Sequence, residues 1–243
     1  MGGHLIQSLK SAPLSHSDPI HIHPTAPLAE RVLLPGDPGR ALALAQSLLQ
    51  EPRMFNHNRG LWGYTGTAPD GLALTVQSTG MGGPSAAIVL TELIALGARR
   101  AIRLGTCGAL APELALGELV IAREAICADG TSRALGGGER VAADPALVHA
   151  LARHAPDAPV GTVVSVDLFY GGDERTAHAD ALAVEMEAAA LFAGGAAAGV
   201  PVACVLAVSD TFDARAARTR IDDAVLLDAA ERMGRVAIAA LSA

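Results

Sequence analysis

Two arginines of this sequence stand where an anion could be bound. Arg40 ends the segment Gly36-Asp37-Pro38-Gly39-Arg40, whose glycines permit close backbone approach and whose helix start offers amide donors. Its planar guanidinium suits phosphate oxygens, although a tight turn with a surface arginine would show the same pattern. Arg103 lies inside the apolar run AIRLG, where burial of an unpaired charge is costly. Arg103 therefore needs an anionic partner, either a phosphate shared with Thr106 or a carboxylate in a structural salt bridge.

The composition argues against several other kinds of site. A net charge of −7 disfavours binding to nucleic acid or to a membrane surface, because both require a basic patch. Without HExxH, CxxC or a GxGxxG after a strand, we expect neither a metal nor a dinucleotide. The widely separated Cys107, Cys127 and Cys204 indicate buried, reduced thiols of an intracellular, cytoplasmic protein. Neither a signal peptide nor a transmembrane segment is expected.

Short apolar runs alternate with amphipathic stretches from Arg31 onward, which predicts strands alternating with helices. We expect strands in RVLLPG, LWGYTGT, LALTVQSTG, RRAIRLGTCGA, GELVIAREAICADG, PVGTVVSVDLFY and PVACVLAVSD. We expect helices in GRALALAQSLLQ, SAAIVLTELIAL, VEMEAAALFAGGAAA and IDDAVLLDAAERMGRVAIAALSA. This alternation predicts an α/β fold, a single domain over residues 20–243 whose mixed central β-sheet is flanked by helices. Residues 1–19 lack any period and form an N-terminal tail whose order the sequence leaves open.

Four loops that follow predicted strands carry unusual residues, namely PGDPGR, GTCGA, DLFY and VSD. In open α/β sheets, ligands bind at the carboxyl ends of strands, on the loops that lead to helices. We therefore expect these four loops to contribute to one binding site.

Longer motifs resemble the nucleoside phosphorylase family, which includes the bacterial hexameric purine nucleoside phosphorylases and the uridine phosphorylases. The segments VLLPGDPGRA, NRGLWGYTGT, STGMGGPSAAIVLTELIALGARRAIRLGTCGA, DLFY, VEMEAAALF and AVSD occur in the family's order. The resemblance extends from His21 to the C-terminus and is most specific over residues 78–109. It implies the nucleoside phosphorylase fold and an enzyme without a cofactor, in which inorganic phosphate is the co-substrate that cleaves the bond between ribose and base.

The resemblance also implies site residues. Positions that hold phosphate in the family match Gly36, Arg40, Arg103 and Thr106, and a position that reaches the neighbouring subunit's phosphate matches Arg59. Positions near the ribose match His21, Met81, Glu185, Met186 and Glu187. The resemblance places this histidine near the ribose 5′-hydroxyl and takes it from the partner chain, and His23 is its rival. Glu187 is expected to accept from the 2′,3′-diol, unless its carboxylate merely favours a helix N-terminus.

The base is expected to stack on Phe169, with Tyr170 as a weaker candidate for the same wall and Ser209 and Asp210 nearby. A purine leaves more readily when N7 is protonated, and Asp210 matches the general acid of the hexameric purine enzymes. Since Asp210 follows the apolar run PVACVLAV, we expect burial to raise its pKa; the alternative is a helix N-cap. An arginine assists this acid in the family. We favour Arg218, and Arg215 and Arg220 remain possible.

Uridine phosphorylases lack the acid and read uracil with a Gln-x-Arg pair after Phe-Tyr. Here Asp173 replaces that glutamine and Arg175 is retained, so purine nucleosides are the expected substrates and uridine the alternative. The choice between 6-amino and 6-oxo purines stays open. A hydrolytic nucleosidase would not need three arginines around an anion, and a non-catalytic nucleoside-binding protein would lack Asp210 or Glu187. By the same resemblance we expect a homodimer with shared active sites, assembled as a hexamer of three dimers.

Overall fold

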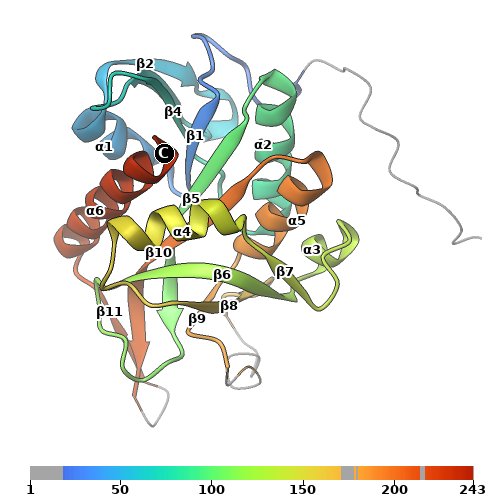
Figure 1. The fold of residues 1–243 in the computed structure, drawn as a ribbon, viewed down its shortest axis with the longest axis vertical. Coiled ribbons are helices and arrows are strands. Elements are labelled where there is room, and N and C mark those ends of the chain that lie inside the picture. Colours follow the sequence, from blue (N-terminus) through green and yellow to red (C-terminus); the bar gives the residue numbers. More distant parts are fainter. Residues whose placement is uncertain (1–18, 171–177, 179, 214–216, 243) are drawn as a thin grey trace, which may run out of the picture.

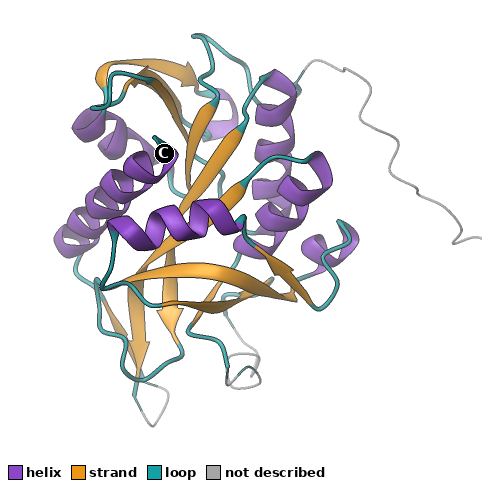
Figure 2. Cartoon of the chain, viewed as in Figure 1, coloured by secondary structure: helices purple, strands orange, loops and turns teal. Residues whose placement is uncertain are grey.

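The computed structural model describes residues 19–170, 178, 180–213 and 217–242. Within these residues, eleven strands form one sheet in the order β11-β10-β6-β8-β9-β5-β1-β4-β3-β2, with β7 paired to β6. Figure 1 shows this sheet running through the middle of the molecule with helices on its flanks, and Figure 2 separates the two kinds of element by colour. None of the described helices combines the length and apolar character needed to cross a membrane.

The strands have the following bounds: β1 (Arg31–Pro35), β2 (Gln50–Asn56), β3 (Gly63–Thr67), β4 (Ala73–Gln77), β5 (Arg100–Ala109), β6 (Leu119–Ala128), β7 (Arg140–Ala142), β8 (Val160–Val166), β9 (Ala183–Glu185), β10 (Val202–Phe212) and β11 (Arg218–Arg220). The helices are α1 (Pro38–Leu48), α2 (Gly83–Leu96), α3 (Gly130–Ala134), α4 (Pro145–His154), α5 (Ala188–Ala198) and α6 (Asp223–Leu241), and η1 (Asn58–Gly60) is a short 3-10 turn.

Part of the sheet closes on itself. Strand β5 pairs in parallel with both β1 and β10, and its last two residues pair with β9. Because β10 also pairs with β6, β6 with β8 and β8 with β9, these five strands form a ring. The strands β1, β4, β3 and β2 extend from β5 as an open sheet. Strand β5 therefore belongs to both parts, and β10 is its neighbour within the ring.

Helices cover the sheet on two flanks. In Figure 1, α1 and α6 lie together on one flank, while α2, α5 and α3 lie on the other, and the same pairs of helices are in contact. Helix α2 begins with Pro84 in its first turn and ends at Gly97, whose φ of 119° lies in the left-handed region. The helix that the sequence predicted over SAAIVLTELIAL is therefore confirmed. The apolar side chains of the strands are buried beneath these helices, as the fully buried Leu33, Ile102 and Leu206 show.

The predicted α/β fold with a mixed central sheet flanked by helices is confirmed, but three local predictions differ from the structure. The GTCGA segment, expected to turn, continues β5 as far as Ala109. Glu185, expected at the start of a helix, lies in β9, and α5 begins only at Ala188. Helix α4 was not predicted, although Asp144 and Pro145 form a standard N-cap and first turn. Residues 1–18 of the expected tail lie outside the described residues.

Candidate active site

Two glycine turns meet at the carboxyl ends of β1 and β4. The amide of Thr79 donates to the carbonyl of Pro35 at 2.9 Å, and the amide of Gly80 donates to the carbonyl of Gly36 at 3.0 Å. A Cβ added to Gly36 would lie 3.2 Å from the Gly80 oxygen and 4.0 Å from Nη1 of Arg103. Gly36 therefore permits a close approach between the two turns. The Arg103 guanidinium faces the corner that these turns form between Gly36 and Gly80.

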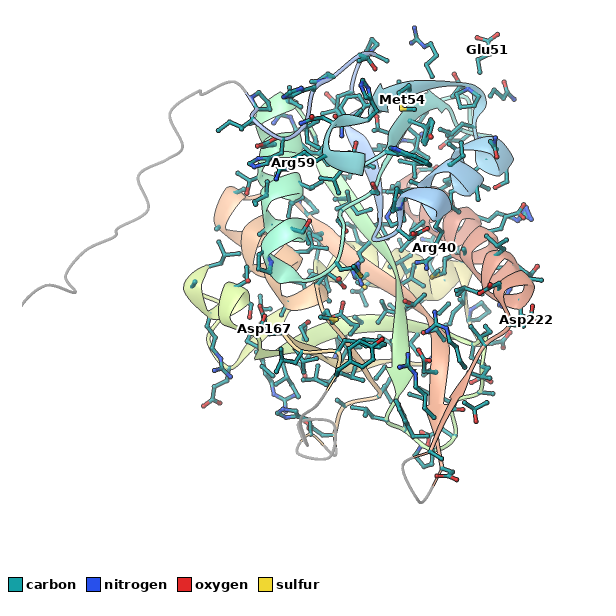
Figure 3. All side chains as sticks on the ribbon, turned by 180° about the vertical axis from the view of Figure 1, so that it is seen from behind. Arg40, Glu51, Met54, Arg59, Asp167 and Asp222 are labelled. Atoms are coloured by element: carbon teal, nitrogen blue, oxygen red, sulfur yellow. The ribbon has the colours of Figure 1, made fainter. Side chains whose placement is uncertain are left out.

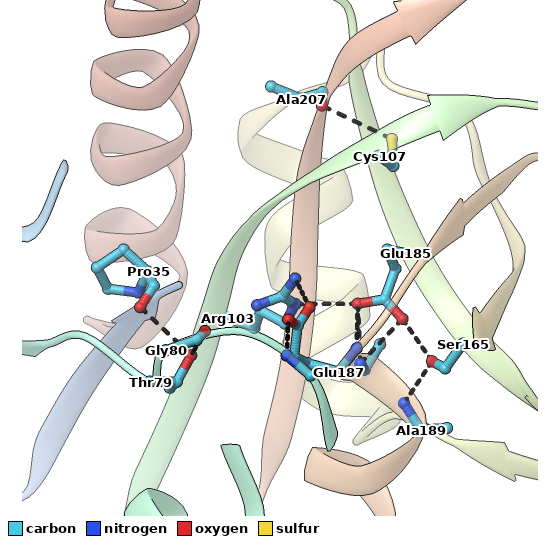
Figure 4. Close-up of polar contacts among 12 residues, drawn as sticks. Pro35, Thr79, Gly80, Arg103, Cys107, Ser165, Glu185, Glu187, Ala189 and Ala207 are labelled. Carbon is cyan, nitrogen blue, oxygen red and sulfur yellow. Dashed lines mark hydrogen bonds and ion pairs between the residues drawn. The ribbon is translucent and has the colours of Figure 1, made fainter. Parts of the chain in front are cut away.

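The buried Arg103 is the centre of a charged cluster (Figure 4). Its Nε donates to Oε2 of Glu185 at 3.1 Å, and its Nη2 donates to Oε2 of Glu187. Burial lowers the pKa of Arg103, but the two carboxylates outweigh burial and raise it, so the guanidinium stays charged. Nη1 is buried and has no hydrogen-bond partner among the described residues. Thus Arg103 forms the salt bridges considered from the sequence, and it also retains one free nitrogen.

Arg40 lies at the start of α1 in the same corner, and Figure 3 shows it near the middle of the molecule. Burial lowers its pKa; among the charges, Asp37 raises it and the neighbouring cations Arg103 and Arg220 lower it. Within the described chain, the Arg40 side chain forms no ion pair. Its backbone amide donates to Asp37 at 2.6 Å, so this amide is not available to a ligand. Arg103 is paired with two carboxylates and Glu187 also raises the pKa of Arg40, so Arg40 is the cation whose missing ion pair within the described residues favours occupation by an anion.

Glu187 and Glu185 differ in what remains free on each carboxylate. Glu187 accepts from the Gly82 amide at 2.6 Å and from Arg103. Glu185 is fully engaged, because it accepts from Arg103, from the Ser165 hydroxyl and from the amides of Glu187 and Ala188. Burial raises the pKa of Glu185. Its contacts indicate that Glu185 supports Arg103 and the start of α5 and does not face a ligand.

The two methionines of the expected ribose site lie in different surroundings. Met81 is 88% exposed, on the glycine turn between β4 and α2. Met186 is partly buried and packs against a small apolar cluster that includes Val164 and Val166. Thr106 lies in β5, opposite Ala207 of β10, and is half-buried.

At the other end of the site, Phe169, Tyr170, Arg218 and Arg220 line an open pocket of about 490 Å³. The two aromatic rings meet edge to face with their centroids 4.9 Å apart. The guanidinium carbon of Arg218 lies 4.6 Å from the centre of the Phe169 ring, within the range of a cation–π contact. This pocket presents an exposed aromatic wall on which a planar base can stack. Asp173, Arg175 and Arg215 lie outside the described residues.

Asp210 is buried, contacts two of the arginines that line this pocket, and is bound by several donors. A β-bulge between Val208 and Asp210 changes the register of β10 against β5. The Ser209 hydroxyl lies 2.7 Å from Oδ2 of Asp210, and Nε of Arg218 donates to Oδ1 at 2.6 Å. Arg220, opposite Asp210 in the β10–β11 pairing, places Nη1 at 3.4 Å from the same oxygen. Of the two candidate arginines that the structure describes, Arg218 thus lies closer to Asp210 than Arg220 does.

The predicted direction of the Asp210 pKa shift is wrong. Burial does raise the pKa of Asp210, as expected, but the hydrogen bonds from Arg218 and Ser209 and the charges of Arg218 and Arg220 outweigh burial and lower it. The reason is β11, which returns beside β10 and brings two arginines to the carboxylate. The helix N-cap alternative is also excluded, because Asp210 lies inside β10.

Arg59 and the two histidines lie away from the Arg40 corner. Arg59 has a φ of 57°, an uncommon conformation for a non-glycine residue, and Figure 3 shows it on η1, apart from Arg40. In the described part of the chain, its exposed side chain has no hydrogen bond or ion pair. The side-chain amide of Asn58 donates to the carbonyl of His21 at 3.0 Å, so His21 lies beside η1. His23 directs Nε2 to the carbonyl of Ile20, at 3.0 Å.

Two contributors were not found from the sequence. Ser165 supports Glu185, and Glu92 of α2 binds the backbone of residues 20–22. The only sequence signal for Glu92 was an acidic residue within the apolar helix SAAIVLTELIAL. Among the described residues, no group of three or more histidine, cysteine or acidic side chains could hold a metal ion.

Comparison with known proteins gives consistent matches. A family profile described as the phosphorylase superfamily matches residues 30–242. The purine nucleoside phosphorylase DeoD-type of Alkaliphilus metalliredigens is 38% identical over 197 residues, covering 76% of this chain and 83% of the relative. The protein of the same name from Clostridium beijerinckii is 38% identical over 207 residues, covering 79% and 86%. That from Geobacillus kaustophilus is 38% identical over 198 residues, covering 76% and 83%. The glycine corner, its arginines and these matches together show that the chain belongs to the phosphorylase superfamily, as the sequence motifs predicted.

Proposed function

We propose that this protein is a purine nucleoside phosphorylase, a pentosyltransferase that uses inorganic phosphate to release the base and form ribose 1-phosphate or deoxyribose 1-phosphate. The observation that carries the proposal is the free Nη1 of Arg103, buried beside Gly36 in a corner that also contains Arg40, unpaired within the described residues. A buried cationic donor without a partner is costly, so it favours a bound anion. The names of the relatives, purine nucleoside phosphorylase DeoD-type, support the same reaction.

Phosphate is held, in this proposal, by Gly36, Arg40, Arg103 and Thr106. Gly36 lets the anion approach the backbone, and the two guanidinium groups neutralise its charge. Glu187 is bonded to Arg103, and this contact supports the proposal that its carboxylate accepts hydrogen bonds from the ribose diol. Met81 and Met186 are proposed neighbours of the ribose. Glu185 does not contact the substrate in this proposal; it holds Arg103 in position by accepting a hydrogen bond from its guanidinium.

The proposed mechanism uses the phosphate, ribose and base residues in turn. As the bond to the base breaks, positive charge develops on the ribose, and a phosphate held by Arg40 and Arg103 stabilises that charge and is positioned to attack. The base stacks on Phe169, with Tyr170 and Ser209 beside it, and Asp210 is directed at N7. Asp210 must gain a proton in the complex, because its bonds with Arg218 and Ser209 lower its pKa and favour the ionised carboxylate in the free protein. Entry of a purine excludes water from the carboxyl and favours its protonated form.

Arg59 and His21 complete the site of a neighbouring subunit in this proposal. Each lies away from the Arg40 corner of its own chain, and Arg59 has no partner in the described part of the chain. We therefore propose a homodimer with shared sites as the minimal unit, assembled as a hexamer. A cytoplasmic location agrees with three free, buried cysteines.

Base release tests the proposal directly. Inosine, adenosine, guanosine and uridine are incubated with the purified protein, with and without phosphate, and the free base is measured. We expect release of the purines only with phosphate and much slower release from uridine. Equal release without phosphate would identify a hydrolytic nucleosidase, and comparable turnover of uridine would favour uridine phosphorylase.

A further inference from the structure

Glu92 gathers an unusual number of donors from one short segment. Its Oε1 accepts from Nδ1 of His21 at 2.6 Å and lies 3.1 Å from the amides of Ile20 and His21. Its Oε2 accepts from the amides of His21 and Ile22, at 2.9 and 2.7 Å. These residues are about seventy positions from Glu92 in the sequence, so the contact fixes the start of the described chain against α2.

The contact also determines which nitrogen of the His21 ring carries hydrogen. The Glu92 side chain is 14% exposed. Burial raises the pKa of Glu92, but the bonds from His21 and from the three amides outweigh burial and lower it. An ionised carboxylate can only accept hydrogen bonds, so Nδ1 of His21 must be a donor. In a neutral ring the other nitrogen, Nε2, is then an acceptor.

The acceptor nitrogen of His21 remains available to a ligand. The His21 side chain is 28% exposed, and Nε2 has no hydrogen-bond partner in the described residues. In contrast, Nε2 of His23 contacts the backbone of its own segment, and its amide donates to Asn56 at 2.9 Å. Of the two candidate histidines, His21 is therefore the one whose ring is both held by an anion and free on its other side.

Hydrogen bonds also connect the His21 segment to η1, the turn that carries Arg59. Asn58 donates to the carbonyl of His21, and the amide of Thr25 donates to the carbonyl of Phe55 in β2 at 2.8 Å. Segment 20–25 is thus tied to α2 by Glu92 and to β2 and η1 by these bonds. A residue that acts in the neighbouring subunit needs such a rigid support, because its own site does not hold it in place.

We propose that Glu92 is a positioning residue that fixes His21 as a hydrogen-bond acceptor, so that the neighbouring site selects nucleosides with a free 5′-hydroxyl. This inference rests on the proposed function, in which His21 reaches the ribose of the partner's substrate. The 5′-hydroxyl donates to Nε2 of His21. A 5′-deoxy or 5′-alkylthio nucleoside offers no donor and leaves Nε2 unpaired in the closed site, which lowers kcat/KM by roughly ten- to a hundredfold.

The test compares phosphorolysis of inosine and 5′-deoxyinosine by four proteins: wild type, Glu92→Gln, His21→Ala and the double variant. We expect the wild type to favour inosine at least tenfold in kcat/KM and His21→Ala to lose this preference. The amide introduced by Glu92→Gln can donate to Nδ1, which allows the other tautomer, so this variant should lose most of the preference. The double variant should behave like His21→Ala, because Glu92 acts only through His21.

A matched control and a second readout separate positioning from general damage. Glu118→Gln changes an exposed carboxylate that also accepts a backbone amide, from Ala115, and should leave the preference unchanged. The ¹⁵N chemical shifts of the His21 ring report the tautomer without substrate. They should show hydrogen on Nδ1 in the wild type and a changed tautomer distribution in Glu92→Gln.

The results distinguish a failure of the inference about Glu92 and His21 from a failure of the proposed function. A preference for inosine that survives in His21→Ala or in Glu92→Gln would overturn the inference, and so would wild-type nitrogen shifts in Glu92→Gln. If Glu92→Gln does not fold, His21→Ala and the wild-type shifts still decide. A wild-type protein that releases no base from inosine would overturn the proposed function instead, while the shifts would still test the link between Glu92 and His21.

Discussion

Arg218 donates from Nε to Oδ1 of Asp210 at 2.6 Å, while its guanidinium covers the Phe169 ring at 4.6 Å. One side chain therefore contacts both the proposed acid and the proposed wall of the base pocket. A purine that stacks on this face of Phe169 has to displace Arg218, and Asp210 then loses its closest cation. Binding of the base and protonation of Asp210 are coupled in this arrangement.

Removal of Arg218 should raise the pKa of Asp210. The bonds and charge of Arg218 oppose the effect of burial, so in Arg218→Ala burial acts with less opposition and the neutral form gains. The measurement is a ¹³C NMR titration of the Asp210 carboxyl in the free protein. Arg235→Ala, which removes an exposed arginine paired with Glu231 on α6, is the control and should leave Asp210 unchanged. An unshifted Asp210 in Arg218→Ala would show that Arg218 does not hold it ionised.

Asp210→Asn should reduce kcat for inosine by about a hundredfold or more, the usual contribution of a general acid. The KM for phosphate should change little, because the anion binds at the other end of the site, near Gly36 and Arg103. Steady-state kinetics with each substrate varied in turn measures both constants. Asp228→Asn makes the same chemical change on the surface of α6 and should have no effect. Full activity in Asp210→Asn would remove Asp210 from its proposed role.

Arg59 and Arg40 allow a test of shared sites. Arg59→Ala and Arg40→Ala should each lower kcat/KM for phosphate by roughly ten- to a hundredfold, since each removes a charged hydrogen bond. Consider a two-fold dimer of one Arg59→Ala subunit and one Arg40→Ala subunit. The site that keeps its own Arg40 receives an intact Arg59 from the partner, whereas the other site has neither arginine. Random mixing of the two variants should therefore recover roughly a quarter of wild-type activity. No recovery in dimers shown to be mixed would place Arg59 in the site of its own chain.

Gly36→Ala should weaken phosphate binding. The added Cβ would lie 3.2 Å from the Gly80 oxygen, so the two turns must separate, and it would also approach Nη1 of Arg103. We expect the KM for phosphate to rise about tenfold, equivalent to about 1.4 kcal/mol. Gly194→Ala in α5 is the control, because its Cβ would make only an ordinary contact at 3.5 Å with Leu90. An unchanged KM in Gly36→Ala would mean that phosphate does not use this turn.

Asp70 should contribute to stability in a pH-dependent way. It pairs with the buried Arg31 at 2.6 Å and also contacts Ser242 near the C-terminus. The bonds from Arg31 lower the pKa of Asp70 and outweigh the smaller effect of burial. A lowered carboxyl pKa stabilises the fold above the unfolded value of about 4, and this contribution disappears as the pH falls through the folded value.

Asp70→Asn should therefore lower the free energy of unfolding at pH 7 by about 1–2 kcal/mol, after allowance for solvent screening. The difference from the wild type should shrink progressively as the pH falls below about 4. Urea unfolding at several pH values and one protein concentration measures it. Asp157→Asn, in the exposed loop after α4, should change nothing. A difference that stays constant with pH would rule out the ionised pair as its cause.

The sequence predicted the long elements and the site corner better than the contacts within them. The apolar periods of α2, β10 and α6 are local signals, and so are Pro84 and Gly97 at the ends of α2. The partners of Arg103 are not local, because Glu185 and Glu187 lie 82 and 84 residues away. Their identity depends on the closed ring of strands, which no sequence period reveals.

The error on Asp210 has a similar origin. Burial could be inferred from the apolar run before Asp210, and burial is present. The opposing charges depend on the β10–β11 pairing, in which Arg220 lies opposite Asp210 and Arg218 lies opposite Phe212. The sequence between Phe212 and Arg218 has no strong signal for that register, so the sign of the pKa shift could be obtained only from the fold.

Arg103 stands on β5 and Asp210 on β10, two hydrogen-bonded strands of the closed ring, and β5 also begins the open sheet. The distance between the anion end and the base end is therefore built into the most constrained part of the scaffold. New substrate ranges should be obtained by directed evolution of the rim, at residues 167–170 and 217–220, rather than of this strand pair. A library confined to the rim would exchange one base for another while the ribose and phosphate end keeps its dimensions.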